Sequence, residues 1–499
     1  MVPNVEQIAE GVIAATPSPR ELLPRVLRST FWMFSSSMLV RVLNLARGII
    51  LARLLLPEDF GLFGLASVII GFTAMFSNVG AGVFLIYRQD DVDEHVDTAF
   101  WVNLGIATLL ATGVAGAAPL VGGFYGRADL VPVLAVLALA LWLQILATVH
   151  ENLLRRELRF RSLALIDALV NIASFVAAVG LAWGGYGVWA FVLSTLLGNA
   201  ARMFLLGYAA RWLPRWRFSR RSLTTLASFS GWYLGSAVTW YLVLNLDNLL
   251  VGKFLGMTAL GIYALAYNYA LVPLTLIANP LGNVTFPELA RLHPNPSLFW
   301  AAFYQFSQLL VESICPIACA LVVAAPDLFP VLFGPKWSDA ILPFQILSVY
   351  VIVRALWVDP FAALGRFDLS TWLALGTCVL GILGIYVGLQ YGIVGVAWAV
   401  LIVVGGAHIG ALYVVSRSVA RVVAGLRNAA PYLATASAAA VLALGARYLC
   451  VQWVGDRKEL LVLLTITTVF TVYGIIFRRH VHDLVAALTG RATRGAEAE

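Results

Sequence analysis

The pattern of hydrophobic and polar positions along the chain is a series of long apolar runs separated by short polar turns. A membrane-spanning helix needs about 20 mostly apolar residues, and the sequence predicts fourteen such segments. They are expected near residues 30–56, 60–87, 98–124, 129–153, 161–184, 186–210, 224–255, 258–283, 298–325, 341–364, 369–390, 392–416, 430–451 and 459–477. Glycine, proline and charged residues mark the turns, as in Pro57-Glu58-Asp59 and Gly334-Pro335. The pattern therefore predicts an all-α polytopic membrane protein with about 14 transmembrane helices.

Composition narrows the class of protein further. Of the 499 residues, 61% are hydrophobic and 12% are charged, whereas a soluble globular protein has about 25% charged residues. These values exclude a soluble enzyme, a secreted disulfide scaffold and a disordered chain. The four cysteines lie in apolar runs without metal-ligand spacing. We expect no metal, no cofactor and no catalytic residue.

The basic residues indicate an orientation in the membrane. The chain has 33 Lys and Arg against 26 Asp and Glu, a net charge of +7. Connections on one predicted side, together with both tails, hold 22 of the basic residues, and the opposite side holds seven. By the positive-inside rule, this bias predicts a multi-pass membrane protein with both termini cytoplasmic. Residues 1–28 lack an apolar run and are expected to form a cytoplasmic tail, not a signal peptide.

Two pairs of similar segments indicate an internal duplication. Residues 53–66 align with residues 253–266 at an offset of 200, and residues 180–188 align with residues 388–396 at an offset of 208. Each offset spans six predicted helices, so the two copies would enter the membrane in the same sense, as in parallel-repeat transporters. The alternative is that glycine-rich turns resemble one another by chance.

The duplication predicts two six-helix lobes around a central cavity, plus two extra C-terminal helices. The expected divisions are a cytoplasmic N-terminal tail (1–28), an N-lobe (29–211), a cytoplasmic linker (212–223), a C-lobe (224–416), helices 13 and 14 (417–478) and a cytoplasmic C-terminal tail (479–499).

Polar and charged residues inside the apolar segments are the candidates for function. A charge at the bilayer centre costs several kcal/mol, so it faces protein or a water-filled cavity. The candidate substrate-binding residues are Arg41, Asn44, Arg47, Arg202, Asn245, Asp247 and Arg354. The candidates for ion coupling are Asp167, Asp247 and Glu312. The alternative for these residues is mutual pairing as buried structural contacts, Arg47 with Asp247 or Arg202 with Asp167.

The chemistry of the four intramembrane arginines suits an anionic head group. A guanidinium presents a planar fork of donors and stays charged, so it matches a diphosphate well. The cavity would then hold a diphosphate or a similar anionic group.

Several short stretches resemble a known family. They are Ala52-Arg-Leu-Leu-Leu-Pro-Glu-Asp-Phe-Gly-Leu62, Phe100-Trp-Val-Asn103, Arg156-Glu-Leu-Arg-Phe160, Tyr263-Ala-Leu-Ala-Tyr-Asn268 and Val331-Leu-Phe-Gly-Pro-Lys-Trp337. In this order they resemble the Wzx-type oligosaccharide flippases of the MOP (multidrug/oligosaccharidyl-lipid/polysaccharide) exporter superfamily, in the branch of colanic-acid and teichuronic-acid exporters.

The resemblance implies a fold, a substrate and a mechanism. The fold is two six-helix lobes in a V plus helices 13 and 14. The substrate is an oligosaccharide on undecaprenyl diphosphate, flipped by alternating access for exopolysaccharide, O-antigen or lipopolysaccharide synthesis. Membrane lipids, polymerases and glycosyltransferases are the implied partners, and no nucleic acid is expected.

The resemblance also implies basic cavity residues on helices 1 and 7. Helix 1 supplies Arg41 and Arg47, and Arg354 matches an arginine of the colanic-acid branch. Helix 7 departs from the pattern, because its central charge is Asp247 and its only base, Lys253, lies near its outer end. One lobe is therefore expected to do most of the anion binding.

Other functions stay open at this point. A cation-coupled multidrug antiporter of the same superfamily should have an acidic cavity. A peptidoglycan-precursor flippase would share the chemistry and differ in the sugar. A membrane glycan polymerase or ligase would need a large external loop or a catalytic His/Asp group, and the sequence shows neither.

Overall fold

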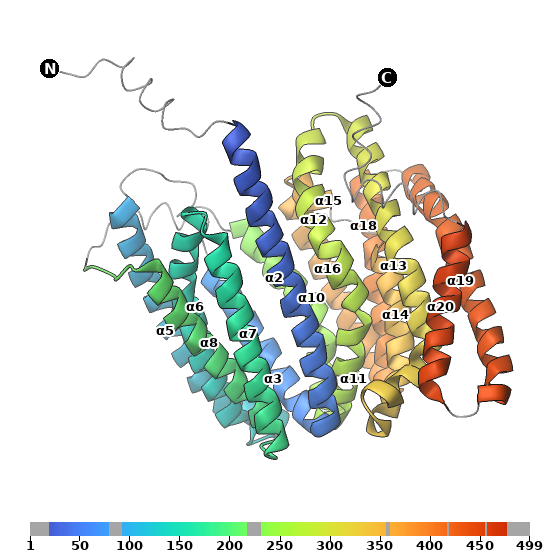
Figure 1. Ribbon diagram of the computed structural model, residues 1–499, viewed down its shortest axis with the longest axis horizontal. Helices are drawn as coiled ribbons and strands as arrows, with labels where there is room; N and C mark the ends of the chain where they lie inside the picture. Colours follow the sequence, from blue (N-terminus) through green and yellow to red (C-terminus); the bar gives the residue numbers. More distant parts are fainter. Residues whose placement is uncertain are drawn as a thin grey trace. The chain divides into compact units, whose positions relative to one another are not determined.

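The computed structural model describes residues 19–78, 92–216, 231–355, 360–416, 419–454 and 457–476, and all regular structure in these ranges is helical (Figure 1). The chain divides into two compact units. Unit 1 comprises Met1–Leu51, Phe76–Gly122 and Arg127–Phe229. Unit 2 comprises Ala52–Met75, Gly123–Gly126 and Ser230–Glu499. The predicted N-lobe and C-lobe follow chain order, whereas these units are defined by packing, so the lobe boundaries stay a prediction.

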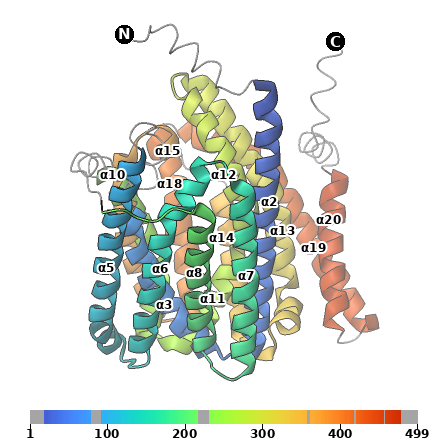
Figure 2. The ribbon, with the colours of Figure 1, turned by 60° about the vertical axis from the view of Figure 1, so that its left-hand side comes forward.

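Unit 1 is built from five long helices. They are α2 (Pro19–Leu54), α5 (Val92–Tyr125), α6 (Leu130–Arg156), α7 (Phe160–Trp183) and α8 (Trp189–Ala210), with the short turn η1 (Phe76–Asn78). The last residues of α2, after Leu51, and of α5, after Gly122, belong to unit 2. Helix α8 packs against both α6 and α7 (Figure 2). A buried apolar cluster joins these three helices: Ala147, Leu154, Leu163, Ile166, Val170 and Leu206.

Unit 2 contains α3 and the helices of the second half of the chain. Its elements are α3 (Pro57–Met75), α10 (Gly231–Phe254), α11 (Gly256–Ala270), α12 (Val272–Leu292), α13 (Pro296–Leu332), η2 (Pro335–Ala340), α14 (Ile341–Ala355), α15 (Pro360–Ala363), α16 (Phe367–Leu389), α17 (Gly392–Ala399), the π-helical η3 (Val400–Val404), α18 (Gly405–Ser416), α19 (Val419–Val454) and α20 (Lys458–Ile476). Helix α3 packs on α11, α10 packs on α16, and α13 packs on α14, α19 and α20.

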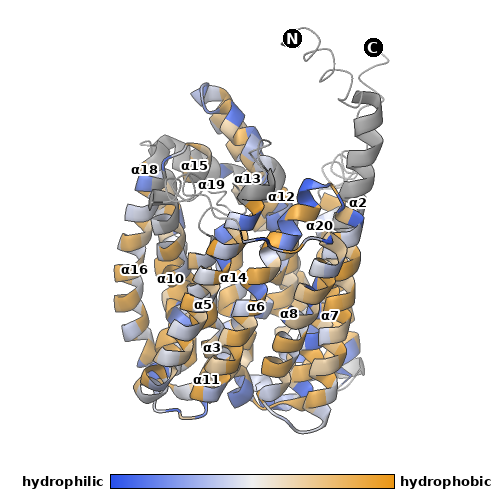
Figure 3. Cartoon of the chain, turned by 90° about the vertical axis from the view of Figure 1, so that its left-hand side faces the viewer, coloured by the Kyte–Doolittle hydropathy of each residue, from blue (hydrophilic) through white to orange (hydrophobic). Residues whose placement is uncertain are grey.

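The prediction of a multi-pass helical membrane protein is confirmed. Hydrophobic residues run along the lengths of the helices (Figure 3), and large apolar side chains such as Leu109 and Phe204 are 71% and 73% exposed, as expected for surfaces that meet lipid. Within the described residues, eleven helices are long and apolar enough to span a membrane, or twelve if a bent pair counts as one span. Helices α2 and α10 occupy the predicted segments 30–56 and 224–255 but are not among these. The count of fourteen therefore stays a prediction.

The predicted single helix at residues 258–283 is not continuous. Helices α11 and α12 meet at Leu271 with a bend of 47°. Pro273 lies in the first turn of α12, where a missing N–H is tolerated, whereas in the middle of a longer helix it would remove a backbone hydrogen bond. The predicted segment 392–416 contains one candidate span, Gly392–Ala411, in which the π-helical η3 lies between α17 and α18.

The ends of α2 and α10 are held in the same way. Arg53 at the end of α2 donates its Nε to the Leu332 carbonyl over 2.8 Å and its Nη2 to the Val331 carbonyl, both at the end of α13. Lys253, its partner in the sequence repeat, donates its Nζ to the Phe124 carbonyl at the end of α5. Cations stabilise helix C-termini because the last carbonyls lack backbone partners. The aligned residues Arg53 and Lys253 therefore make the same kind of contact, each to carbonyls at the end of another helix.

The α13–α14 connection covers the end of α2 further. Lys336 donates to the carbonyls of Arg53 (3.0 Å) and Leu55 (2.5 Å), and Trp337 donates its indole N–H to the Ala52 carbonyl over 2.8 Å. Trp337 is fully buried. This connection carries the Val331–Trp337 motif, so one role of that motif is to cap α2.

An ion pair attaches the C-terminal helices to the body of unit 2. Arg447 of α19 donates Nε and Nη2 to the two carboxylate oxygens of Asp327 of α13, over 2.6 and 3.1 Å. Asp327 is buried. Small residues of the same helices, Ala320, Ala439 and Ala443, pack nearby with Val323 and Val469. Helices α19 and α20 are therefore a packed part of unit 2.

Candidate functional site

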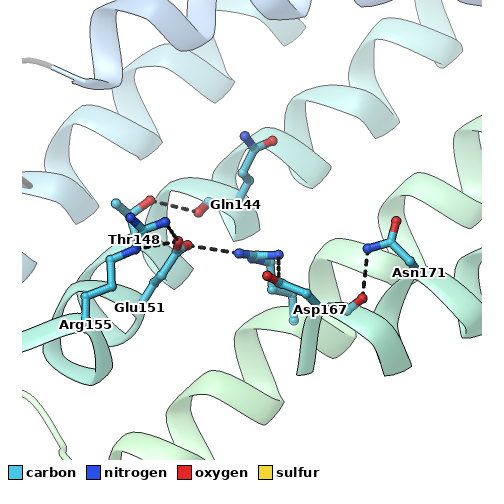
Figure 4. A network of polar contacts seen from close by, with 7 residues as sticks. Gln144, Thr148, Glu151, Arg155, Asp167 and Asn171 are labelled. Carbon is cyan, nitrogen blue, oxygen red and sulfur yellow. Dashed lines mark hydrogen bonds and ion pairs between the residues drawn. The ribbon is translucent and has the colours of Figure 1, made fainter. Parts of the chain in front are cut away.

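The central feature of unit 1 is an arginine held between two carboxylates. Arg202 of α8 donates Nη1 to Oδ1 of Asp167 on α7 over 2.5 Å, and Nη2 to Oε2 of Glu151 on α6 over 3.0 Å (Figure 4). The two ends of one guanidinium fork therefore serve two different helices. This confirms the sequence-based alternative that Arg202 pairs with Asp167.

A second arginine completes the network. Arg155, one turn beyond Glu151 on α6, donates Nε and Nη2 to Oε1 of Glu151 over 3.1 and 2.6 Å (Figure 4). The four side chains carry two positive and two negative charges. They are 20–47% exposed, so the network is not sealed by protein. A neutral and partly open network can exchange one of its members for another ion.

Polar groups border this network along the same helices. Asn171 donates to the Asp167 backbone carbonyl over 2.8 Å, and Thr148 donates to the Gln144 carbonyl over 3.3 Å (Figure 4). Asn199 of α8 donates to the Ala140 carbonyl of α6 over 3.0 Å. Such side chains can hydrogen-bond a sugar or a phosphate after small rotations.

The close packing of α8 places Arg202 between its partners. One turn before it, Gly198 lies so near α7 that a Cβ atom would be 2.3 Å from the Ser174 hydroxyl. One turn after it, Leu206 is fully buried in the cluster that joins α6, α7 and α8. Because residues four apart lie on one face of a helix, Arg202 must emerge in the seam between α6 and α7.

The three candidates on the first helix lie on α2. Arg41 and Arg47 are half-buried and Asn44 is exposed. Helix α2 lies beside α7, because the Ser36 hydroxyl donates to the Ala164 carbonyl over 3.2 Å and the Arg161 guanidinium lies 5.5 Å from the Trp32 ring centre. These two contacts set a register in which Arg41 is level with residue 169. Arg41 thus lies within about one helical turn of the level of Asp167.

Asp247 has its own partners inside unit 2. Its Oδ2 accepts from the Tyr263 hydroxyl over 2.7 Å, and its Oδ1 accepts from the backbone N–H and side-chain amide of Asn248 over 2.8 and 3.2 Å. Both Asp247 and Tyr263 are buried. These contacts satisfy a carboxylate that would otherwise be costly to bury.

The remaining candidates of unit 2 lie on three different helices. Asn245 donates to the Tyr241 carbonyl of α10 over 2.8 Å, and Arg354 donates to the Tyr350 hydroxyl of α14 over 3.3 Å. Glu312 of α13 accepts at its backbone carbonyl from the Tyr473 hydroxyl of α20 over 2.9 Å. In the described part of the chain, no group of three His, Cys, Asp or Glu residues is placed to hold a metal ion.

The structure brings together Asp167 and Arg202 and adds two residues that the sequence argument left aside. Glu151 lies inside the predicted segment 129–153, and Arg155 is one of the 22 basic residues counted on the predicted cytoplasmic side. Their i, i+4 spacing is typical of a helical ion pair, and an acidic residue within an apolar segment is itself a signal of function.

The helical fold is shared with solved membrane transporters. The fold is similar to that of the solved lipid II flippase MurJ in an inward closed conformation, with 14% identity, a TM-score of 0.67 and coverage of 90% of this chain and 99% of that one. It is also similar to an inward-facing MATE transporter of the MOP superfamily (17% identity, TM-score 0.62, covering 80% and 99%). At such identities the likeness shows the fold.

Sequence comparison places the chain in a family. Residues 50–342 match the family model described as polysaccharide biosynthesis protein, and the chain belongs to this family. It is 26% identical over 386 residues to the teichuronic acid biosynthesis protein TuaB of Bacillus subtilis (strain 168), covering 76% of this chain and 80% of the relative. It is 26% identical over 393 residues to the lipopolysaccharide biosynthesis protein WzxC of Escherichia coli (strain K12), covering 77% and 79%.

Proposed function

We propose that the protein flips oligosaccharide repeat units linked to undecaprenyl diphosphate from the cytoplasmic to the outer leaflet. The observation that carries the proposal is the presence of basic side chains on several helices of unit 1. Arg41 and Arg47 lie on α2, and Arg202 lies at the neighbouring α6–α7–α8 seam. Family membership supports the same conclusion, because its relatives act in the synthesis of teichuronic acid and lipopolysaccharide.

The proposed mechanism is binding and reorientation without covalent chemistry. The guanidinium groups of unit 1 hold the diphosphate through charge-assisted hydrogen bonds. Asn44, Asn245, Asp247 and Arg354 are the further candidates for contact with the head group. The lipid tail stays in the bilayer, and alternating access then exposes the head group to the other side. The glycan enters the synthesis of an exopolysaccharide, O-antigen or lipopolysaccharide.

The location and partners belong to the same proposal. The excess of basic residues on one predicted side supports an inner-membrane protein with both termini cytoplasmic. Glycosyltransferases would supply the lipid-linked unit and a polymerase would consume it. Cation-coupled drug export is the second candidate, favoured by the superfamily of a similar fold and opposed by the basic excess on α2.

Native mass spectrometry of the purified protein tests the proposal. Protein prepared from membranes that make a lipid-linked oligosaccharide should retain an adduct with the mass of undecaprenyl diphosphate plus glycan. Arg41→Gln and Arg47→Gln should each lose the adduct, whereas Arg366→Gln, at an exposed ion pair with Asp368, should keep it. Retention by both α2 variants, or absence of the adduct from the wild type, would contradict the proposal.

A further inference from the structure

The Asp167–Arg202–Glu151–Arg155 network presents a puzzle for anion binding. Close packing of α8 against α6 and α7 fixes the position of Arg202. However, both ends of its guanidinium group are already paired with carboxylates. With two acids and two bases, the network offers an incoming diphosphate no net attraction. For Arg202 to hold a phosphate, one carboxylate must leave or lose its charge.

The two carboxylates are not equally held. Glu151 accepts from two arginines, through Oε2 from Arg202 and through Oε1 from Arg155. In the described residues, the ion pair of Asp167 is with Arg202 alone, through Oδ1. Asp167 is also the more exposed of the two acids, at 33% against 20%. Asp167 is therefore the member that gives up its charge more readily.

The groups around Asp167 favour this exchange. Glu151 and Arg155 approach it from α6, Arg202 from α8, and Asn171 and Arg161 lie on its own helix. Arg41 lies near its level on α2. A protonated carboxyl becomes a hydrogen-bond donor, so a neutral Asp167 could donate to a phosphate oxygen that takes its place on Arg202.

We propose that this network is a proton-linked oxyanion site, in which the diphosphate of the lipid substrate displaces Asp167 from Arg202 as Asp167 takes up a proton from water. The inference rests on the proposed function and adds that substrate binding is coupled to the uptake of a proton. Binding consumes one proton and release returns it, so substrate affinity should rise as pH falls. The ligand is recognised by its diphosphate, whatever glycan it carries.

Calorimetry on the purified full-length protein tests this site. The probe is geranyl diphosphate, a short soluble polyprenyl diphosphate, titrated between pH 5.5 and 8 in buffers of different ionisation enthalpy. The wild type should take up about one proton per diphosphate bound at the alkaline end of the range. Asp167→Asn should bind without proton uptake at the alkaline end of the range. Its affinity should change less with pH than that of the wild type, and the remaining change belongs to the terminal phosphate of the probe, which titrates at about pH 6. Arg202→Gln should bind about tenfold or more weakly.

A matched control separates this site from any arginine–aspartate pair. At the other end of α6, Arg127 donates to both oxygens of Asp129 over 3.0 and 2.5 Å, and this hydrogen bonding lowers the pKa of Asp129. Asp129→Asn should leave proton uptake unchanged. Glu151→Gln provides a second variant if Asp167→Asn fails to fold, and it should reduce the proton uptake.

The outcomes are distinguishable. Wild-type binding without proton uptake at any pH, or full uptake by Asp167→Asn, would overturn the proton-linked site and leave the flippase function standing. Absence of geranyl diphosphate binding in the wild type, together with absence of the lipid-linked adduct, would contradict both.

Discussion

Gly61 of α3 and Gly261 of α11 lie face to face where the two helices cross. A Cβ atom on Gly61 would be 1.8 Å from the Met257 carbonyl oxygen, and one on Gly261 would be 1.7 Å from the Pro57 carbonyl oxygen. The pairs 61/261 and 57/257 are related by the offset of 200 residues found in the sequence. The contact is therefore reciprocal, as expected when two copies of a duplicated unit pack around a local two-fold axis.

This crossing should tolerate no side chain. Gly61→Ala and Gly261→Ala each place a methyl group against backbone, which cannot rotate away, so each should reduce the free energy of unfolding by about 1–3 kcal/mol or more. Thermal unfolding of the detergent-solubilised protein measures this loss.

The control for the crossing lies on the same helix. Gly64 is one turn further along α3, and a Cβ atom there would lie 3.9 Å from Ala264, an ordinary contact. Gly64→Ala should leave the unfolding temperature unchanged or raise it, because alanine favours helix. Equal losses for Gly61→Ala and Gly64→Ala would show that the crossing is not close-packed.

The ion pair between Asp327 and Arg447 should matter for the attachment of α19. Arg447→Met leaves a buried carboxylate without its partner and should cost about 3 kcal/mol of stability. The double variant Asp327→Leu/Arg447→Met should recover most of that loss, since removing both charges is far less costly than removing one. A double-mutant cycle measured by thermal unfolding gives the coupling energy between Asp327 and Arg447. Losses of stability that simply add would contradict the role of this ion pair.

The caps at the ends of α13 and α5 should act locally. Arg53→Gln should speed hydrogen exchange in residues 331–337, and Lys253→Gln should speed it in residues 124–127, because each removes a cation from unpaired terminal carbonyls. Hydrogen-exchange mass spectrometry reads each segment separately. Arg457→Gln, an exposed residue before α20, is the control. Unchanged exchange in both segments would refute the capping role.

The arginines of α2 should be needed for transport. Arg47→Gln should lower the rate of flipping about tenfold or more, because it removes a charge-assisted contact to the diphosphate. Folding is checked by the unfolding temperature of the same preparation, and Arg366→Gln serves as the control. Flipping at the wild-type rate by a folded Arg47→Gln protein would exclude this residue from the site.

The sequence predicted the helical membrane class and the Gly61/Gly261 equivalence, because hydropathy and repeat offset can be read along the chain. It offered the Arg202–Asp167 pair only as the alternative to substrate binding, because opposite charges in neighbouring segments permit both. It missed the role of Glu151, since that contact joins positions 51 residues apart and depends on how α6 packs on α8. The break at Leu271 had a signal in Pro273, which the apolar run around it outweighed.

The central claim is lipid-linked oligosaccharide transport, and a flipping assay tests it most directly. The purified protein is reconstituted into liposomes with a fluorescent short oligosaccharide on undecaprenyl diphosphate, and a membrane-impermeant quencher reports the fraction in the outer leaflet. Wild-type vesicles should become fully quenchable over time, while protein-free vesicles and Arg41→Gln/Arg47→Gln vesicles stay near half-quenched. Wild-type vesicles that behave like protein-free vesicles, while exporting a cationic dye, would contradict the account and favour the antiporter.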